Sequence, residues 1–156
     1  MAKTNAIRLI EQAKIPYRTA EYDYDEKDLS GLHAAKAVGL PPEQVFKTLV
    51  ARGAKQGILV FCIPVACTLD LKKAASAANE KSIEMVHMKE LLMLTGYIRG
   101  GCSPVGMKKS YPTYIDETAE LFDEIAVSAG ARGQQIIVPP ERLIEYVRMT
   151  VCDLTQ

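Results

Sequence analysis

Apolar residues follow a helical period in several parts of the chain. In the first of these, the apolar positions between Ile7 and Ala13 lie on one helical face, with Thr4 or Asn5 as the N-cap, and Pro16 ends the segment. The same reasoning predicts helices at 30–38 behind an N-cap at Ser30, at 70–78, at 88–94 before Gly96, and after Pro139-Pro140. Short helices are therefore expected at intervals along the whole chain.

Runs of apolar and β-branched residues between these helices predict short strands. Residues 45–50 and 58–63 flank a turn rich in Gly and Lys at 53–57, which predicts a hairpin. Other extended segments are expected at 17–22, 83–86, 114–115, 125–127 and 136–138. Because strands and helices do not alternate strictly, we predict a mixed α/β fold, with a strongly curved mixed sheet surrounded by helices.

Length and composition favour one domain over residues 1–156. An apolar content of 48% is enough for a core without disulfide or metal support. Charged residues make up 24% and balance to a net charge of zero, which excludes a highly charged surface or a membrane-coating helix. No apolar run approaches the length that spans a bilayer, so we expect a cytoplasmic protein without a membrane partner.

The spacing of cysteine and histidine residues indicates neither a metal site nor a disulfide scaffold. The four cysteines lack CxxC spacing and are expected to be reduced thiols: Cys62, Cys67, Cys102 and Cys152. His33 and His87 are far apart and lie in no zinc-binding pattern. We therefore predict that the protein uses no metal and no cofactor.

Lys47 is the most informative charged residue, because it lies in the middle of a predicted strand. Alternation places it on the same face as Val45 and Leu49. If both faces of the strand are covered, Lys47 is a desolvated cation that needs an anionic or carbonyl partner. If the strand lies at a sheet edge, which the sequence alone favours, the side chain reaches out to water.

Two loops could carry chemistry. The segment 100–106 lacks the GxGxxG spacing of nucleotide-binding loops. Its adjacent Gly100 and Gly101 could point backbone N–H groups at an ester carbonyl. The alternative is that this segment is only a tight structural turn. Residues 128–133 predict a hairpin connection that begins with the hydroxyl of Ser128. With no GxSxG elbow and no histidine nearby in sequence, Ser128 is predicted to hydrogen-bond a substrate rather than to attack it.

Taken together, these segments resemble the YbaK/EbsC family of aminoacyl-tRNA editing domains, which also occurs as an insertion in bacterial prolyl-tRNA synthetases. The resemblance covers nearly the whole chain. It is carried by Ile15-Pro16-Tyr17 with Tyr22, by 45–49 around Lys47, by 71–75, by 95–97 running into 100–106, and by the 128–133 hairpin. The family implies a barrel-like sheet, a cleft for the aminoacylated 3′ end of tRNA, and hydrolytic removal of a wrong amino acid.

The resemblance also implies roles for individual residues. Lys47 and Gly101 match the functional lysine and the loop glycine of the family and are predicted to be catalytic. The predicted substrate-binding residues are Tyr22, Gly100, Ser103 and Ser128, and the predicted tRNA-binding residues are Lys108, Lys109 and Arg132. One position departs from the family pattern, because relatives often have an acidic residue where this chain has Gln135.

The resemblance to cysteine-specific members of the family implies that this chain is a trans-editing deacylase. It would remove cysteine from tRNA(Pro), with Cys-tRNA(Cys) as a further substrate. In such members the thiol of the substrate attacks the ester carbonyl and leaves as a cyclic thiolactone, a lyase-like route that needs no enzyme nucleophile. Two alternatives stay open: a deacylase of the same fold for Ala-tRNA(Pro), and a non-catalytic regulatory or binding module. The expected partners are the aminoacylated tRNA end and a prolyl-tRNA synthetase that supplements weak tRNA affinity, and not DNA.

Overall fold

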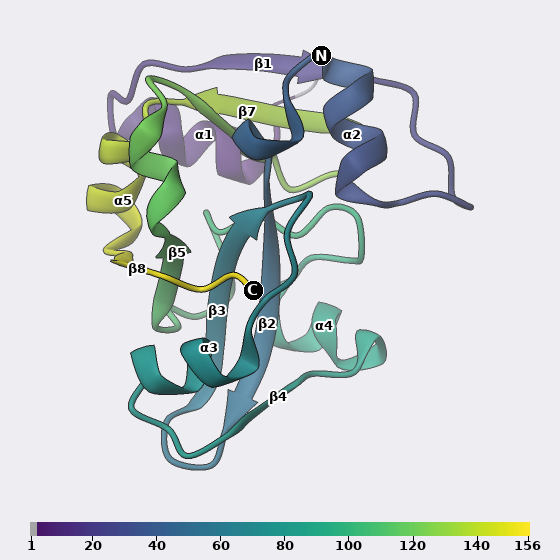
Figure 1. Cartoon of the computed structure of the whole chain (residues 1–156). Helices are drawn as coiled ribbons and strands as arrows, with labels where there is room; N and C mark the ends of the chain where they lie inside the picture. The colour runs from purple at the N-terminus through teal and green to yellow at the C-terminus, as the bar shows by residue number, and fades with distance from the viewer. Residues whose placement is uncertain (1–2) are drawn as a thin grey trace.

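The computed structural model describes residues 3–156; Met1 and Ala2, the first residues of the predicted domain, lie outside the described part. Two sheets form its centre (Figure 1). One is antiparallel, in the order β1 (Arg18–Glu21), β7 (Gln134–Val138) and β6 (Ile125–Ser128). The other is mixed, in the order β4 (Ile83–Met85), β2 (Phe46–Gly53), β3 (Gly57–Pro64), β5 (Thr113–Asp116) and β8 (Thr150–Cys152).

The two sheets meet where Val45, just before β2, forms a parallel bridge with Ala126 of β6. The path from β6 through this bridge into β2 makes one curved surface, which is barrel-like but does not close. The predicted fold class, a curved mixed sheet surrounded by helices, is therefore confirmed.

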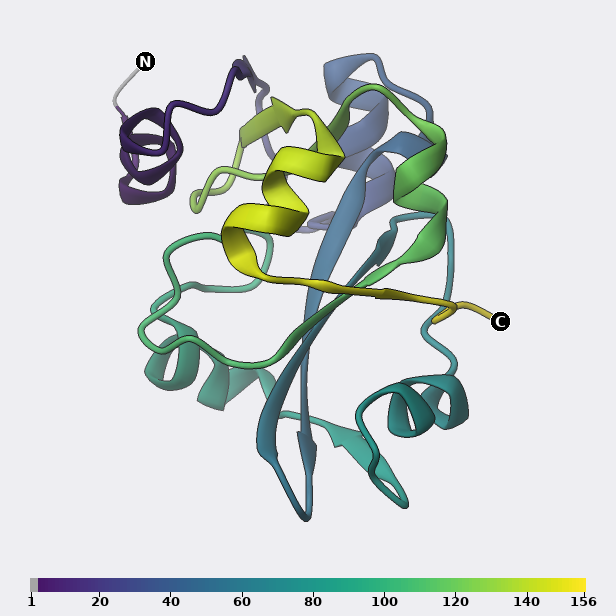
Figure 2. The ribbon, with the colours of Figure 1, turned by 90° about the vertical axis from the view of Figure 1, so that its left-hand side faces the viewer.

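Short helices cover this surface on several sides (Figures 1 and 2). They are α1 (Asn5–Gln12), α2 (Gly31–Val38), α3 (Leu71–Ala77), α4 (Met88–Thr95) and α5 (Pro140–Val147), with 3₁₀ turns η1 (Pro42–Gln44) and η2 (Glu117–Leu121). The predicted caps are confirmed: the hydroxyls of Thr4 and Ser30 accept the backbone N–H of Ile7 and His33. Gly96 ends α4 in the left-handed conformation, as predicted.

The predicted hairpin is also confirmed as β2 and β3. Its register pairs Lys47 with Ile63 and closes at Gly53 and Gly57. On the other side of β2, strand β4 pairs only with residues 51–53. At Lys47 the strand is therefore an edge, as the sequence favoured.

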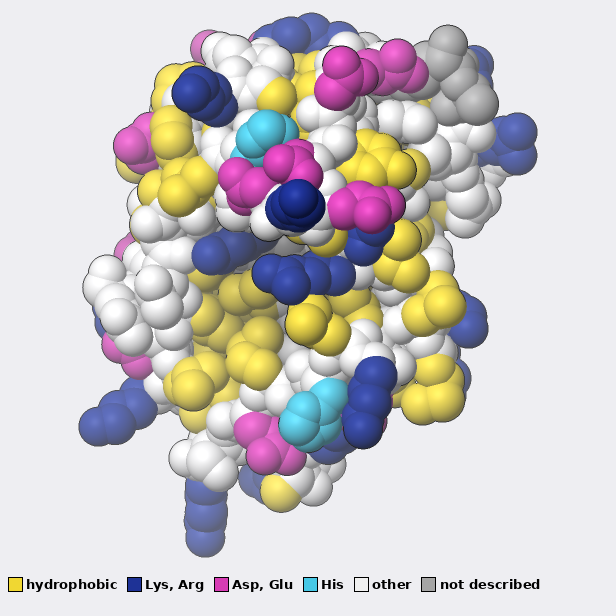
Figure 3. All heavy atoms as spheres, turned by 90° about the vertical axis from the view of Figure 1, so that its right-hand side faces the viewer, with side chains coloured by type: hydrophobic (Ala, Val, Ile, Leu, Met, Phe, Trp, Pro, Cys, Tyr) yellow, Lys and Arg dark blue, Asp and Glu magenta, His cyan; other side chains and the backbone are white. Residues whose placement is uncertain are grey.

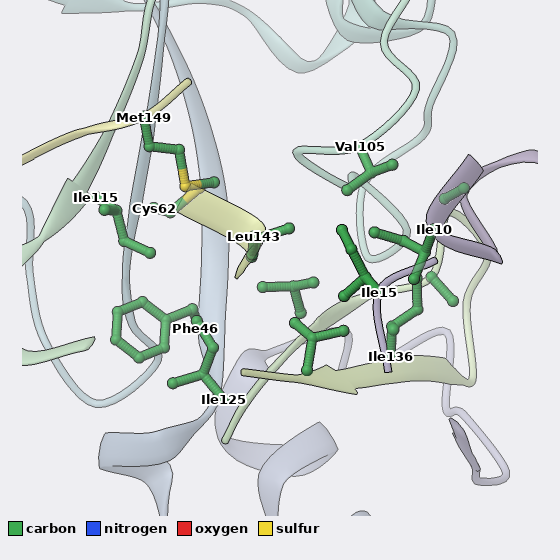
Figure 4. Close-up of a cluster of buried hydrophobic side chains, with 14 of the residues drawn as sticks. Ile10, Ile15, Phe46, Cys62, Val105, Ile115, Ile125, Ile136, Leu143 and Met149 are labelled. Carbon is green, nitrogen blue, oxygen red and sulfur yellow. The ribbon is translucent and has the colours of Figure 1, made fainter. Parts of the chain in front are cut away.

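The largest apolar cluster lies between α1, α5 and the two sheets (Figure 4). Ile10, Ile125, Ile136 and Leu143 are completely buried in it, and Phe46 joins it from β2. Burial of side chains of this size stabilises the fold by about 1.5–3 kcal/mol each, before the entropy cost of ordering the chain. This cluster ties together segments from both ends of the chain.

Strand β8 and the 3₁₀ turn η2 were not predicted from the sequence, whereas η1 begins at Pro41-Pro42, where a new start was expected. β8 has three residues and pairs in parallel with β5, so it depends on a neighbour far away in the chain rather than on local periodicity. Within residues 3–156, none of the helices has the length and apolar character needed to cross a bilayer.

Candidate active site

A cleft of about 500 Å³ lies between the start of α2, strand β2, the β4–α4 connection and the ends of β6 and β7. Its walls include Tyr22, Lys47, Gly100, Ser128 and Gln135, which come from five separate segments. On this side of the molecule apolar side chains fill a hollow, and Lys and Arg side chains cross it (Figure 3). The structure thus brings Lys47, Tyr22, Gly100 and Ser128, predicted from sequence, to one place.

Lys47 contributes a cation to the wall of the cleft. Its side chain is half-buried, and within the described residues it forms neither an ion pair nor a side-chain hydrogen bond. At this edge of the sheet, Lys47 lies in the wall of the cleft. A second cation, Arg99, lines the same cleft, and no Asp or Glu of residues 3–156 does. The arrangement can attract an anionic or carbonyl group.

Ser128 and Gln135 form a directly opposed pair on β6 and β7, so their side chains lie on the same face. The Ser128 hydroxyl oxygen accepts the backbone N–H of Gly130 at 3.1 Å. That bond uses one of the two lone pairs of the oxygen, and the hydroxyl hydrogen can still donate to a ligand. Gln135 is 6% exposed, and its Oε1 atom has no hydrogen-bond partner among the described residues.

Gly101 packs against the backbone of the 128–133 hairpin. A Cβ atom added there would lie 3.2 Å from the carbonyl carbon of Ala131 and from the amide nitrogen of Arg132, so no larger residue fits without moving the hairpin. The Gly101 N–H already donates to the carbonyl oxygen of Ile98 at 3.0 Å. The predicted catalytic contact of Gly101 stays a prediction, and it would have to use the carbonyl oxygen of this residue.

Tyr97 holds the glycine loop and the hairpin together. Its hydroxyl donates to the carbonyl oxygen of Val105, and its ring closely approaches Gly130, where an added Cβ would lie 2.9 Å from Cε1. Burial raises the pKa of Tyr97 to about 12, so the phenol stays a hydrogen-bond donor at neutral pH. This contact ties the glycine loop at Val105 to the hairpin at Gly130, two residues after Ser128.

Tyr22 and Ser103 are placed differently. The Tyr22 N–H donates to the carbonyl oxygen of Gly133, and its ring meets His33 edge-on at the rim of the cleft, with 6.3 Å between ring centroids. Ser103 is completely buried, and its Oγ accepts the N–H of Val105 at 3.2 Å. The structure places Ser103 inside the loop, where it stabilises a turn and does not line the cleft.

The predicted tRNA-binding residues are spread around the mouth of the site. Arg132 donates from Nε to the carbonyl oxygen of Arg99 at 2.9 Å, which places its guanidinium beside Gly100. Lys108 and Lys109 are exposed on the loop that follows and do not line the cleft. Of the three predicted residues, Arg132 lies nearest the cleft, beside Gly100, whereas the Lys108 N–H donates to the carbonyl oxygen of Thr95 at the far end of α4.

No nucleophile activated by a base is present in the cleft wall. Burial raises the pKa of the Cys102 thiol to about 11, so the thiol stays protonated near neutral pH. Neither His33 nor His87 lines the cleft. Across residues 3–156 there is also no group of three or more His, Cys, Asp or Glu side chains that could hold a metal ion.

Part of the wall was not found from the sequence. Gly31 and Leu32 at the start of α2, and Met85, Met88 and Leu91 around β4 and α4, complete the cleft. The sequence signal that could have found the second group is the number of apolar residues in the segment MKELLMLT of α4, more than one buried face needs; in the structure Met88 is 62% exposed. Only the fold shows that they face α2.

A sequence profile described as the aminoacyl-tRNA editing domain matches residues 31–146, a stretch that contains β2, the glycine loop and the β6–β7 hairpin. The chain belongs to the aminoacyl-tRNA editing domain family. A relative from Enterococcus faecalis, provisionally named Cys-tRNA(Pro)/Cys-tRNA(Cys) deacylase EbsC, is 46% identical over 153 residues, which cover 98% of this chain and 93% of the relative.

Solved structures agree with this family. One superposes with a TM-score of 0.85 at 26% identity and is described provisionally as a trans-editing enzyme for prolyl-tRNA synthetase. The match covers 100% of this chain and 99% of the matched chain. Another, of a hypothetical protein, has a TM-score of 0.86 at 19% identity, with 96% of this chain and 97% of its own covered. The latter shows the editing-domain fold alone.

Proposed function

We propose that this editing domain is a trans-editing aminoacyl-tRNA deacylase that removes cysteine wrongly attached to tRNA(Pro), with Cys-tRNA(Cys) as a further substrate. The observation that carries the proposal is a cleft that offers Lys47 and the Ser128 hydroxyl as donors but no base-activated nucleophile. Such a site can position an ester and stabilise negative charge on its carbonyl oxygen, while the attacking group comes from the substrate. The 46% identity to a protein named for this activity supports it.

The proposed chemistry begins with attack by the cysteine thiol of the substrate on its own ester carbonyl carbon. A carbon–sulfur bond forms, the ester carbon–oxygen bond breaks, and the proton of the thiol ends on the released ribose hydroxyl. The products are uncharged tRNA and a cyclic thiolactone, which water opens to free cysteine. Lys47 and Ser128 are proposed to stabilise the oxyanion that develops during attack.

We propose that the tRNA end approaches past Arg99 and Arg132, with Lys108 and Lys109 further out on the acceptor stem. The whole chain has no net charge, and affinity for nucleic acid depends mainly on phosphate neutralisation, so binding to tRNA alone is expected to be weak. Docking to prolyl-tRNA synthetase would raise the local concentration of substrate. We therefore propose a cytoplasmic role for residues 1–156 as one editing unit beside the synthetase.

The deciding experiment follows loss of the ester from Cys-tRNA(Pro), Ala-tRNA(Pro) and Pro-tRNA(Pro) with the purified protein. We expect fast deacylation of the cysteinyl ester and slow deacylation of the other two. Faster loss of alanine would assign the activity to the alanine-specific type, and no loss of any ester would contradict a catalytic role.

A second substrate comparison tests the mechanism. Ser-tRNA(Pro) differs from Cys-tRNA(Pro) only by oxygen in place of sulfur, and a neutral hydroxyl is the poorer nucleophile. We expect much slower deacylation of the seryl ester and a thiolactone as the first product from the cysteinyl ester. Equal rates, with free cysteine as the first product, would require a water molecule activated by the enzyme.

A further inference from the structure

Strand β2 contributes its edge to the cleft rather than one of its faces. All residues from Val45 to Val50 line the wall. A strand that presented a face would contribute only alternate residues, because successive side chains point to opposite sides. The backbone N–H and C=O groups along this edge are therefore part of the cleft.

Two backbone hydrogen bonds show which residues of β2 point to this edge. The N–H of Val65, just after β3, donates to the carbonyl oxygen of Val45 at 2.8 Å, so the backbone groups of Val45 face β3. The Val86 N–H donates to the carbonyl oxygen of Val50 at 3.1 Å, so Val50 faces the opposite edge. These directions alternate along an antiparallel strand, so Thr48 faces the same edge as Val50.

Thr48 occupies a gap in the pairing of this edge. Before the gap Val45 forms the bridge to β6, and after it Val50 is bonded to Val86. Among the described residues, neither the N–H nor the C=O of Thr48 has a hydrogen-bond partner, and the residue is half-buried in the cleft wall. A free backbone donor and acceptor on a strand edge form a template for another extended segment.

An aminoacyl ester has the atoms to pair with Thr48 as one extra strand residue would. In an antiparallel sheet, two directly opposed residues can exchange both of their N–H···O=C hydrogen bonds. The aminoacyl group carries its donor, the α-amino group, and its acceptor, the ester carbonyl oxygen, on adjacent carbon atoms, as a strand residue does. The amine can donate to the Thr48 carbonyl oxygen while the ester carbonyl oxygen accepts the Thr48 N–H.

The position of Thr48 also suits the reacting carbonyl group. The bridge between Val45 and Ala126 is parallel, so Lys47 and Ser128 each lie two residues beyond it on their strands. Both therefore lie at the same end of the cleft as Thr48, and all three line its wall. No Asp or Glu of residues 3–156 lines this wall, so no carboxylate there competes with the Thr48 carbonyl oxygen for the amine.

We infer that the aminoacyl group binds to the Thr48 backbone as a one-residue addition to the edge of β2. The inference rests on the proposed function and extends it, because the Thr48 N–H becomes a further donor to the oxyanion that forms during attack by the thiol. The two hydrogen bonds involve only atoms that all α-aminoacyl esters share. Selection among amino acids is therefore left to the side chains that surround the substrate side chain.

The first test follows backbone amide exchange by NMR with a stable analogue, 3′-amino-3′-deoxyadenosine acylated with cysteine through an amide. In the free protein, the Thr48 N–H should exchange at least about tenfold faster than the N–H groups of Lys47 and Leu49, which face β3. Saturation with the analogue should slow exchange at Thr48 by roughly tenfold, the effect of one hydrogen bond. Exchange at Lys47 and Leu49 should stay unchanged, because their partners lie in β3.

The second test removes the donor from the backbone. Replacement of Thr48 by its α-hydroxy acid analogue exchanges the N–H for an oxygen and keeps the side chain. We expect kcat/KM on Cys-tRNA(Pro) to fall about tenfold, mainly in kcat, since the hydrogen bond strengthens as charge develops on the carbonyl oxygen.

Thr19 offers a matched control on the free edge of β1. The Tyr22 N–H donates to the carbonyl oxygen of Gly133, so alternation turns the backbone groups of Thr19 away from β7. Thr19 does not line the cleft. The same α-hydroxy replacement there also removes an outward N–H and weakens the preceding ladder carbonyl, and it should leave kcat/KM unchanged.

The outcomes separate this inference from the proposed function. Binding of the analogue without slower exchange at Thr48, or equal activity of the two α-hydroxy proteins, would overturn the inference and leave the deacylase activity in place. If the protein altered at Thr48 does not fold, the exchange measurement on the wild type decides. Failure of the wild type to deacylate Cys-tRNA(Pro), with no protection of Thr48, would overturn the proposed function and this inference with it.

Discussion

Strands β6 and β7 place an apolar pair of side chains on one face and a polar pair on the other. On the first face, Val127 and Ile136 oppose each other, are 1% and 0% exposed, and pack in the largest apolar cluster. On the other face, the next pair along, Ser128 and Gln135, is nearly as buried at 8% and 6%. There the side chains are polar, and an acceptor stays unpaired.

The difference separates two uses of burial. On the apolar face, burial removes hydrocarbon from water and stabilises the fold. On the polar face, burial removes competing water from groups that await a ligand, which strengthens their interaction with it at some cost in stability. Mutations of Val127 or Ile136 should therefore change stability, and mutations of Ser128 or Gln135 should change activity.

The largest effect is expected on the apolar face. Ile136→Ala should lower the free energy of unfolding by about 2–5 kcal/mol, through lost burial and an unfilled cavity. Urea denaturation followed by circular dichroism measures it. The matched control is Leu121→Ala, because Leu121 is 77% exposed and its truncation should change stability by less than about 0.5 kcal/mol. Similar losses in the two variants would refute the assignment of the cluster as the stability core.

Lys47→Ala should have the next largest effect, in this case on activity. Removal of a cation that stabilises the oxyanion is expected to lower kcat/KM on Cys-tRNA(Pro) by at least about a hundredfold. The free energy of unfolding should stay unchanged. Lys55→Ala is the control, since Lys55 lies exposed in the turn of the same hairpin. Full activity of Lys47→Ala would remove this residue from the proposed mechanism.

Ser128→Ala should have a smaller effect, because it removes one neutral donor. We expect kcat/KM to fall about tenfold, the value of one hydrogen bond. Single-turnover deacylation should show the loss in the chemical step rather than in tRNA binding. Ser110→Ala, at an exposed position, should behave as wild type, and a drop in tRNA affinity alone would instead assign Ser128 to binding.

The smallest effect is expected for the thiol that also lines the cleft. Burial raises the pKa of Cys102 to about 11, so it cannot serve as a thiolate nucleophile at neutral pH. Cys102→Ala should therefore change kcat/KM by less than about threefold. Deacylation at pH 7 measures it, and an inactive but folded variant would show that the enzyme supplies the nucleophile.

Most secondary structure could be predicted from the sequence, because helices and hairpins depend on neighbouring residues. Thr4 and Ser30 cap the helices expected of them, and the β2–β3 hairpin closes at the expected turn. The three-residue strand β8 could not be predicted, since it pairs with β5, more than thirty residues earlier along the chain.

For the site, the sequence by itself determined which segments carry polar groups and glycines at positions of restricted geometry: 45–49, 100–106 and 128–133. The sequence could not determine which hydrogen-bonding atoms of these segments stay available to a ligand. Only the tertiary structure buried Ser103 inside the loop and left the Gln135 oxygen unpaired beside Ser128. The physical reason is that periodicity and capping act over a few residues, whereas satisfaction of a hydrogen-bonding group depends on segments that folding brings together.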